Sequence, residues 1–539
     1  MIEFKHKLPS MNIDGKRNGT YNNRELGFPS ILTTEDYRLG VFIDDLRSSI
    51  LKERSLVFID GKILLCDKNW IRDHTHVMKA MRHWEHDIYS FLDFIIETQR
   101  EDGQFFELIK QYDDYHWKFV NEDCYKMYPE DNVALVRLEI EADIEYLVVE
   151  CAMYVYHTTG DDEWLKWALP HLEKGIDYVT SDAKRWDSEY GLCKRAATID
   201  TWDFTNDTRS HEDRRINPDT PMSIMHGDNT GVYQAMLQLA WFNRRLNREE
   251  KAKEWERRAE ELRNNIMKHL WNGKFFIHQL HLGHDGVDNL ENERLSLSNS
   301  YALNRGILTT DEARCIIEEY MERRKDGKYF AEWFTIDPPY ESFCELKVGQ
   351  YVNGAISPFT AGELAKGAFN NGYEEYGWDI ISRFIELIER DGTAYFLYFP
   401  DSMPQPDGGP SAWGAAALIS AVDEGLAGIT DMGVNYDEMG FSPKFPVTHY
   451  DELRYLTGYE VNKTLVDVRY ILTEMGMRYD IYSPAKKINA HILLPKGKTC
   501  QKLLVDGKEF AFEISTVGKS RYVDAIIPGD KKVSIEVIF

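Results

Sequence analysis

Residues 195–212, RAATIDTWDFTNDTRSHE, gather the side chains of this chain that are best suited to chemistry. Three aspartates, Asp200, Asp203 and Asp207, stand around Trp202, and the segment lies between stretches of helical periodicity. Such a segment buries few apolar side chains and brings like charges together, so it is more often a functional site than a simple connection. A carboxyl group beside an aromatic ring can act as a proton donor, because desolvation raises its pKa. We therefore predict that this segment belongs to an active site.

The motif around Asp203 resembles the signature of a known group of enzymes. Residues 201–209, TWDFTNDTR, are similar to the Gly-Trp-Asp-Phe-Ser-Ser-Arg signature of the trehalases and processing α-glucosidases, with threonine in place of the glycine and the arginine two places later. The resemblance implies that Asp203 is a general acid and that Trp202 and Arg209 contact a sugar. A simpler interpretation is that Asp203 caps a helix or pairs with Arg209.

A second acidic residue is required, because hydrolysis of a glycosidic bond uses one protonated and one ionised carboxyl group. Residues 398–418, YFPDSMPQPDGGPSAWGAAAL, resemble the glucoamylase arrangement of an acidic residue, a glycine loop and a helix. This resemblance implies that Asp401 is the general base, with aspartate in place of the usual glutamate. Asp407, Glu363 and Glu345 are the alternatives, and a solvated loop carboxylate is an equally open interpretation of Asp401.

Further residues are predicted to bind the sugar. Trp70, Arg72 and Asp73 resemble a Trp-x-Arg-Asp element of six-hairpin glycosidases, which holds neighbouring hydroxyl groups through charge-assisted hydrogen bonds. A buried Arg–Asp pair at a helix start explains the last two nearly as well. His226 and Asp228 open another helix together, although a helix cap also explains Asp228.

Two positions late in the helical region complete the predicted site. The segment YVNGAISPF, residues 351–359, is similar to the Asn-Gly-x-x-x-Pro loop of related phosphorylases and hydrolases, which places Asn353 near the pocket. Trp413 is included among the substrate-binding residues, although a core position suits it better than a stacking platform.

The elements that must position these residues are mostly helices. From residue 86 to about residue 430, apolar side chains recur at helical spacing, as at Ile144, Leu147, Val148 and Cys151. The connections are long and polar, at residues 100–130, 181–230, 272–300, 326–356 and 390–412. A simple bundle needs only ~2–8 residues per connection. Roughly a dozen helices with long connections on one side resemble the six-hairpin glycosidases, which implies a mainly α fold, an (α/α)6 toroid.

β-structure is predicted at both ends of the chain. The first 65 residues have an extended or irregular pattern, and β-prone runs flank Asp60-Gly61, a strong hairpin signal. After residue 430, segments alternate like antiparallel strands. We predict a β-rich N-terminal lead-in (1–66), an (α/α)6 catalytic domain (67–432) and a C-terminal antiparallel β domain (433–539).

Composition limits the partners and the compartment. The chain has 539 residues with 90 acidic and 64 basic side chains, and its net charge of −26 disfavours nucleic acid as a partner. The start MIEFKHKLPS does not predict a signal peptide, and no apolar run reaches the ~18 residues of a membrane span. Seven scattered cysteines without C-x-x-C spacing fit reduced thiols in the cytoplasm.

Other kinds of chemistry lack their signatures. The sequence contains no phosphate-loop, zinc-protease or α/β-hydrolase motif. The histidine pairs His74/His76 and His281/His284 could bind a metal, but solvation is the simpler interpretation because no third ligand is evident. We therefore expect no metal and no cofactor, a small carbohydrate as the substrate, and leave open whether the chain forms oligomers.

Taken together, these resemblances predict a glycoside hydrolase that cleaves an oligosaccharide or small glycoside with inversion, using Asp203 as acid and Asp401 as base. An inverting phosphorylase is the nearest alternative, since phosphate would replace the base. A polysaccharide lyase with a His/Tyr/Arg set is a third possibility, and a non-catalytic carbohydrate-binding protein is a fourth. The sequence does not identify the sugar or the anomeric linkage.

Overall fold

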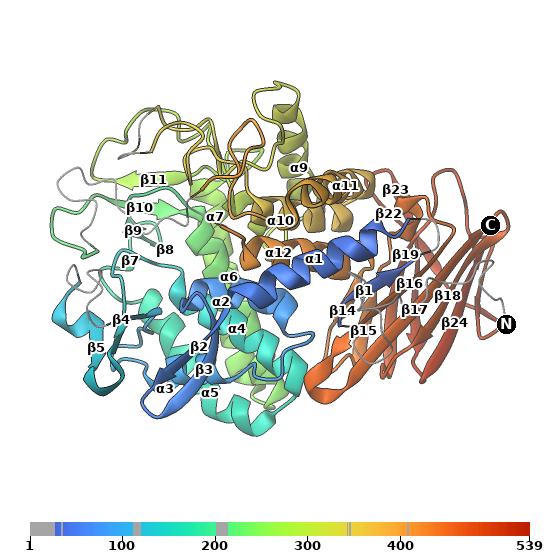
Figure 1. Cartoon of the computed structure of the whole chain (residues 1–539), viewed down its shortest axis with the longest axis horizontal. Helices are drawn as coiled ribbons and strands as arrows, with labels where there is room; N and C mark the ends of the chain where they lie inside the picture. Colours follow the sequence, from blue (N-terminus) through green and yellow to red (C-terminus); the bar gives the residue numbers. More distant parts are fainter. Residues whose placement is uncertain are drawn as a thin grey trace.

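The computed structural model describes residues 27–33, 36–111, 120–200, 214–341, 343, 346–406 and 409–539. Within these ranges there are twelve α-helices in the middle of the chain and two large sheets formed mainly by its C-terminal part. Figure 1 shows the helices in the centre and the C-terminal sheets at one end of the molecule. None of the described helices combines the length and the apolar composition that a membrane span requires.

Six helices contact one another in a closed order, in which each touches the next and the last touches the first. They are α2 (Ile71–Met81), α4 (Ile144–Thr159), α6 (His226–Arg245), α8 (Ser298–Ala302), α10 (Pro358–Asn370) and α12 (Ala412–Ser420). The other six pack against members of this set. They are α1 (Arg38–Glu53), α3 (Ser90–Glu97), α5 (Asp162–Val179), α7 (Glu249–Leu270), α9 (Thr310–Arg324) and α11 (Glu374–Asp391). We call the first six the inner helices and the others the outer helices.

The connections between helices alternate in length, and this alternation determines where the loops lie. Short connections follow the inner helices, as between α4 and α5 or between α6 and α7, so the two helices of each such pair are expected to run antiparallel. Long connections precede the inner helices α4, α6, α8, α10 and α12. The long connections therefore lie at the N-terminal ends of the inner helices. Figure 1 shows strands of the first three long connections, such as β4 (Leu108–Gln111), β10 (Met222–Met225) and β11 (Gln279–Leu282), at the end opposite the C-terminal sheets.

These connections contain small sheets. β4 (Leu108–Gln111), β6 (Val133–Val136) and β5 (Tyr125–Tyr128) form one, and β9 (Arg195–Ala196), β10 (Met222–Met225) and β11 (Gln279–Leu282) form another. Two-stranded pairs join β7 (Trp186–Asp187) to β8 (Leu192–Cys193), and β12 (Leu295–Ser296) to β13 (Ile336–Asp337). Because β10 ends where α6 begins, the second sheet fixes the start of that helix.

Side-chain caps explain where several helices begin. Asp161 accepts hydrogen bonds from the backbone N–H groups of Glu163 and Trp164 at the start of α5. Ser357 and Ser411 cap α10 and α12 in the same way. Inner helices also approach closely: a Cβ added at Gly362 in α10 would lie 2.4 Å from a backbone carbon of Ala417 in α12. Only glycine permits this separation.

The C-terminal part forms β-structure, as predicted, and its strands lie in two sheets. One has the order β1-β16-β17-β18-β24-β20-β21, with β16 (Glu452–Tyr459), β17 (Thr464–Thr473), β18 (Gly476–Tyr482), β24 (Lys532–Ile538), β20 (Lys502–Val505) and β21 (Lys508–Phe510). The other has the order β14-β15-β19-β23-β22, with β14 (Ile429–Asp431), β15 (Glu438–Phe441), β19 (Lys487–Leu493), β23 (Ser520–Pro528) and β22 (Glu513–Val517). All these pairings are antiparallel except β15 with β19, which is parallel. One continuous apolar core joins the inner helices to these sheets.

The N-terminal part differs from the prediction. The hairpin of β2 (Arg54–Ile59) and β3 (Lys62–Asp67) is confirmed, and Asp60 and Gly61 at its turn both have positive φ. However, residues 38–53 form α1 rather than extended structure, and this helix packs on α12. β1 (Ser30–Leu32) pairs with β16, so the two ends of the chain share one sheet.

Candidate active site

Most of the residues predicted to bind sugar lie at the beginnings of inner helices. Arg72 is in the first turn of α2, His226 and Asp228 are in the first turn of α6, and Trp413 is the second residue of α12. The ring of His76 from α2 stacks on Trp413, with 4.2 Å between the ring centroids. Side chains distant in the sequence therefore meet at the end of the molecule that carries the long connections.

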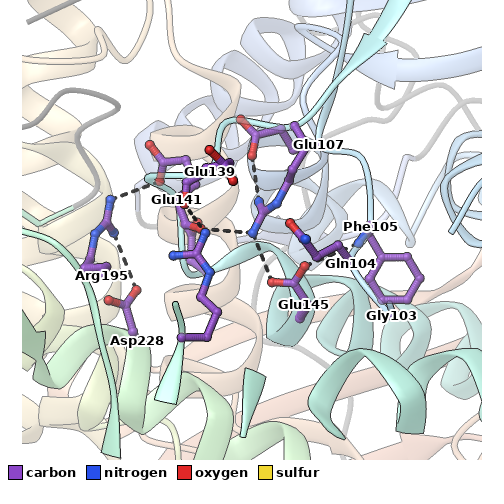
Figure 2. Close-up of polar contacts among 12 residues, drawn as sticks. Gly103, Gln104, Phe105, Glu107, Glu139, Glu141, Glu145, Arg195 and Asp228 are labelled. Atoms are coloured by element: carbon purple, nitrogen blue, oxygen red, sulfur yellow. Dashed lines mark hydrogen bonds and ion pairs between the residues drawn. The ribbon is translucent and has the colours of Figure 1, made fainter. Parts of the chain in front are cut away.

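A buried ion-pair network joins the beginnings of three inner helices, α2, α4 and α6. Arg72 donates to both carboxylate oxygens of Asp143, at 2.6 and 2.9 Å, and also pairs with Glu141. Arg195 lies between Glu141, at 3.2 Å, and Asp228, at 3.6 Å, as Figure 2 shows. Burial raises the pKa of Asp143, but the Arg72 guanidinium outweighs it and keeps this carboxyl ionised.

A second buried group supports the first. Arg137 is fully buried, pairs with Glu107 at 2.7 Å and Glu145 at 3.2 Å, and donates to the Glu141 carbonyl at 2.9 Å. Figure 2 shows Glu107 and Glu145 on the two sides of one guanidinium group. The sequence prediction missed Arg137 and its carboxylate partners. Their signal was present, because acidic residues stand at every second position from 139 to 145, directly before the apolar stripe of α4.

Carboxyl groups at the start of α6 have opposite pKa shifts. Burial raises the pKa of Asp228 to about 6, although Arg195 opposes this shift. Burial also raises the pKa of Asp200, but the nearby imidazoles of His226 and His278, together with the hydroxyl groups of Ser296 and Ser298, more than offset it, so the net shift is downward. Two neighbouring carboxyl groups whose environments separate their pKa values are typical of sites that transfer protons.

The raised pKa of Asp228 predicts a pH-dependent stability difference. Between pH 4 and pH 6 the unfolded chain loses this proton while the folded protein retains it, so the stability of the wild type falls relative to that of an Asp228→Asn variant. The pKa of about 6 corresponds to a relative change of roughly 3 kcal/mol, complete above pH 6. Urea unfolding of both proteins at pH 4, 5, 6 and 7 measures it; parallel pH profiles would contradict the prediction.

Deeper between the inner helices, Glu363 forms an ion pair with Lys79 and accepts a hydrogen bond from Asn304 at 2.8 Å. Both members of the ion pair are buried. Trp413 donates to the hydroxyl of Tyr301 at 2.8 Å and is itself buried, so it is a core residue rather than an exposed stacking platform. As an alternative base, Glu363 would first have to separate from its lysine.

The remaining described candidates lie differently. Asn353 is buried, and among the described residues its amide bonds to backbone groups of Tyr340 and Leu346, which braces the loop. Asp401 is exposed, and its carboxylate caps a turn by accepting from Met403 N at 3.1 Å. Trp70 is half-buried, directly before α2, with the Lys110 ammonium 5.6 Å from its ring centroid. Asp73 follows in the first turn of α2.

Several predicted residues lie outside the described ranges. They are Trp202, Asp203 and Arg209, together with the alternative bases Glu345 and Asp407. The described chain reaches Asp200 on one side of the first segment and Arg214 on the other, and both are buried. Asp200 lies beside the start of α6, since its Oδ1 is close to Gly227. In the described ranges, no three His, Cys, Asp or Glu side chains are arranged to hold a metal ion.

Comparison with known proteins identifies the family. The family model of the mannosylglycerate hydrolase MGH1-like glycoside hydrolase domain matches residues 70–399, which is more than half of the chain. The chain belongs to this family. The predictions of a six-hairpin type of glycosidase and of glycosidase activity at the level of the family are therefore confirmed. No curated protein sequence is detectably similar to this glycoside hydrolase.

Solved structures share the fold of this glycoside hydrolase at low sequence identity. The α-L-rhamnosidase from Dictyoglumus thermophilum is 12% identical with a TM-score of 0.56, over 95% of this chain and 50% of that chain. The α-L-rhamnosidase from Streptomyces avermitilis is 11% identical with a TM-score of 0.57, over 95% of this chain and 42% of that chain. The chain thus spans half or less of the length of these rhamnosidases.

A shorter protein matches over its whole length. The GH63 mannosylglycerate hydrolase from Thermus thermophilus is 13% identical with a TM-score of 0.50, over 71% of this chain and 100% of that chain. At these low identities, the similarities concern the fold alone.

Proposed function

We propose that this chain hydrolyses a glycosidic bond with inversion, with Asp203 as the general acid and Asp401 as the general base. The family match over residues 70–399 carries the proposal. The buried carboxyl and guanidinium groups at the starts of α2 and α6 support it, because such groups hold and polarise sugar hydroxyls. The segment with Asp203 is anchored beside them at Asp200.

The proposed scaffold is an (α/α)6 toroid of residues 67–432, between a lead-in of residues 1–66 and a β domain of residues 433–539. The closed order of contacts among the inner helices supports it, as does the regular alternation with outer helices. In such a ring the long connections form one rim, on the side of the starts of α2, α6 and α12.

The proposed reaction divides the work between two carboxyl groups. Asp203 would give its proton to the leaving oxygen while the base takes a proton from the attacking water on the opposite face of the sugar. Inversion requires a separation of ~6.5–9.5 Å between the carboxyl groups to accommodate that water. Glu363 is the alternative base among the described residues, and its carboxylate forms an ion pair with Lys79.

The substrate class follows from the structural neighbours. Two are named α-L-rhamnosidases and one is named a mannosylglycerate hydrolase, so α-L-rhamnosides and mannosylglycerate are the first substrates to test. A small glycoside or an oligosaccharide end fits this group of proteins.

Replacement of the base is expected to abolish most turnover. Asp401→Asn should lower kcat by about 10²- to 10⁴-fold, because the attacking water loses its proton acceptor. NMR of the first-formed sugar in the wild type should show the inverted anomer. Asp326→Asn, an exposed aspartate in the loop after α9, is the matched control and should keep wild-type kcat. Full activity of Asp401→Asn together with an inactive Glu363→Gln would transfer the role to Glu363.

A requirement for phosphate separates hydrolysis from phosphorolysis. Turnover of the same substrates in phosphate-free buffer should be undiminished and should yield the free sugar. A glycosyl phosphate formed only with added phosphate would instead establish the inverting phosphorylase.

We also place the protein in the cytoplasm. The six cysteines among the described residues are all free thiols, and four of them are buried. This state is typical of a reducing compartment.

A further inference from the structure

Four buried side-chain atoms of aspartates and histidines near the start of α6 make no hydrogen bond in the described part of the chain. They are Oδ2 of Asp200, Nε2 of His226, Oδ2 of Asp228 and Nε2 of His278. The four side chains are at most 5% exposed. An unsatisfied buried polar group is destabilising, so several in one place point to a ligand that completes them.

Two of these side chains, His226 and Asp228, lie in the first turn of α6, and the segments that carry Asp200 and His278 lie beside that turn. His226 and Asp228 lie one residue on either side of Gly227, and a Cβ added at Gly227 would lie 3.1 Å from Asp200 Oδ1 and 2.4 Å from Ser298 Oγ. A glycine at this position therefore lets the Asp200 carboxylate lie against the first turn of the helix, where the helix dipole favours a negative charge. The His278 ring is held in place by Glu291, since its Nδ1 is 2.9 Å from Glu291 Oε2.

Three of the four atoms are hydrogen-bond acceptors at neutral pH. His226 Nδ1 is 2.9 Å from the Ile277 carbonyl, which can only accept, so Nδ1 carries the hydrogen. Burial lowers the pKa of His226 to about 4, so the ring is neutral and its Nε2 presents a lone pair. The net pKa of Asp200 is lowered and that of Asp228 is about 6, so both carboxyl groups are mainly ionised at pH 7.

We propose that Asp200, His226 and Asp228 form a subsite for two neighbouring hydroxyl groups of the sugar, in which the protein accepts each hydrogen bond and the ligand donates. This inference rests on the proposed function and assigns Asp200 to the binding of substrate. A sugar with free, adjacent hydroxyl groups at these positions fits. A sugar that is deoxygenated, fluorinated or O-methylated there lacks the donor and does not fit.

Monosaccharide analogues test the direction of these hydrogen bonds on the wild-type protein. D-mannose, L-rhamnose, D-glucose and D-galactose are titrated by calorimetry at pH 7, and the deoxy, deoxyfluoro and aminodeoxy analogues of the tightest ligand follow. A fluorine accepts but does not donate, whereas an ammonium group donates. At two adjacent positions we expect the fluoro and deoxy analogues to lose affinity equally, about 10- to 100-fold, while the amino analogue retains it. Fluoro analogues that bind like their parents at every position would overturn the proposal, as would the absence of saturable binding by all four sugars.

Variants test which residues accept. Asp200→Asn should weaken binding of the parent sugar by about 10- to 100-fold. It should not weaken further the binding of the analogue that is fluorinated at the hydroxyl group contacted by Asp200, because that contact is already lost. Asp431→Asn is the control, since Asp431 also has a buried, unpaired Oδ2 but lies in β14 of the C-terminal sheets. Equal binding by Asp200→Asn and the wild type would overturn the assignment. Hydrolysis is measured separately, so a protein that shows the analogue pattern without turnover refutes the proposed function and leaves the subsite standing.

Discussion

Asp203→Asn is expected to lower kcat by about 10²- to 10⁴-fold on glycosides with poor leaving groups, because their leaving oxygen requires a proton. The loss should be much smaller for a 2,4-dinitrophenyl glycoside, whose leaving group departs without protonation. KM should change little, since the amide retains the size of the carboxyl group. Steady-state kinetics on a series of aryl glycosides measures the effect as the slope of log kcat against the pKa of the leaving phenol.

The neighbouring Asp207→Asn variant is the control for this experiment, because it removes a carboxyl from the same segment. It should keep the shallow slope of the wild type. An equal loss of kcat across all leaving groups in Asp203→Asn would show that Asp203 supports the site without donating the proton. Wild-type kinetics in that variant would remove Asp203 from the mechanism altogether.

Arg137→Met is expected to be the most destabilising single change in the described network. The substitution leaves the buried carboxylates of Glu107 and Glu145 without the guanidinium that lies between them. Removal of one partner of a buried ion pair costs about 3–5 kcal/mol, since a charge is left in a medium of low polarity. The midpoint of urea unfolding measures the loss, and methionine preserves most of the volume.

The matched control is Arg257→Met. Arg257 forms an ion pair with Glu261 at 2.5 Å on the surface of α7, where the two side chains are 61% and 62% exposed. Such pairs contribute about 0.3–0.5 kcal/mol, so this variant should unfold almost like the wild type. Adding Glu107→Gln to Arg137→Met should recover part of the lost stability. Equal midpoints for Arg137→Met and Arg257→Met would show that the buried network is not the stabilising feature.

Local features of the fold were predicted because they depend on neighbouring residues. The turn at Asp60-Gly61 requires positive φ at both positions, which this pair tolerates, and the hairpin follows. The apolar stripe from Ile144 to Val155 is buried along α4, since the 3.6-residue period places it on one face. Helix α1 was missed although Leu39, Phe42, Ile43 and Leu46 are spaced for a helix. No side-chain cap marks its beginning.

The candidate site was only partly accessible from the sequence. The resemblance identified the starts of α2 and α6, and the structure brings Arg72, Arg195 and Asp228 into one network there. Asn353 matched a family loop equally well, yet its amide is used entirely by the loop backbone. Which atoms a polar side chain finds depends on the packing of distant segments, and a motif does not contain that information.

The sequence by itself determined most of the helical and β regions, the hairpin at Asp60-Gly61 and the glycosidase family, because each depends on short-range periodicity or on a local motif. Only the tertiary structure decided that Glu141, Asp143 and Glu145 are buried against Arg72, Arg137 and Arg195. It also decided that Asp200 lies against the first turn of α6 with an unpaired oxygen. The physical reason is that charge burial is a property of the assembled tertiary structure. A carboxylate can leave water only when guanidinium groups from other segments arrive at the same place.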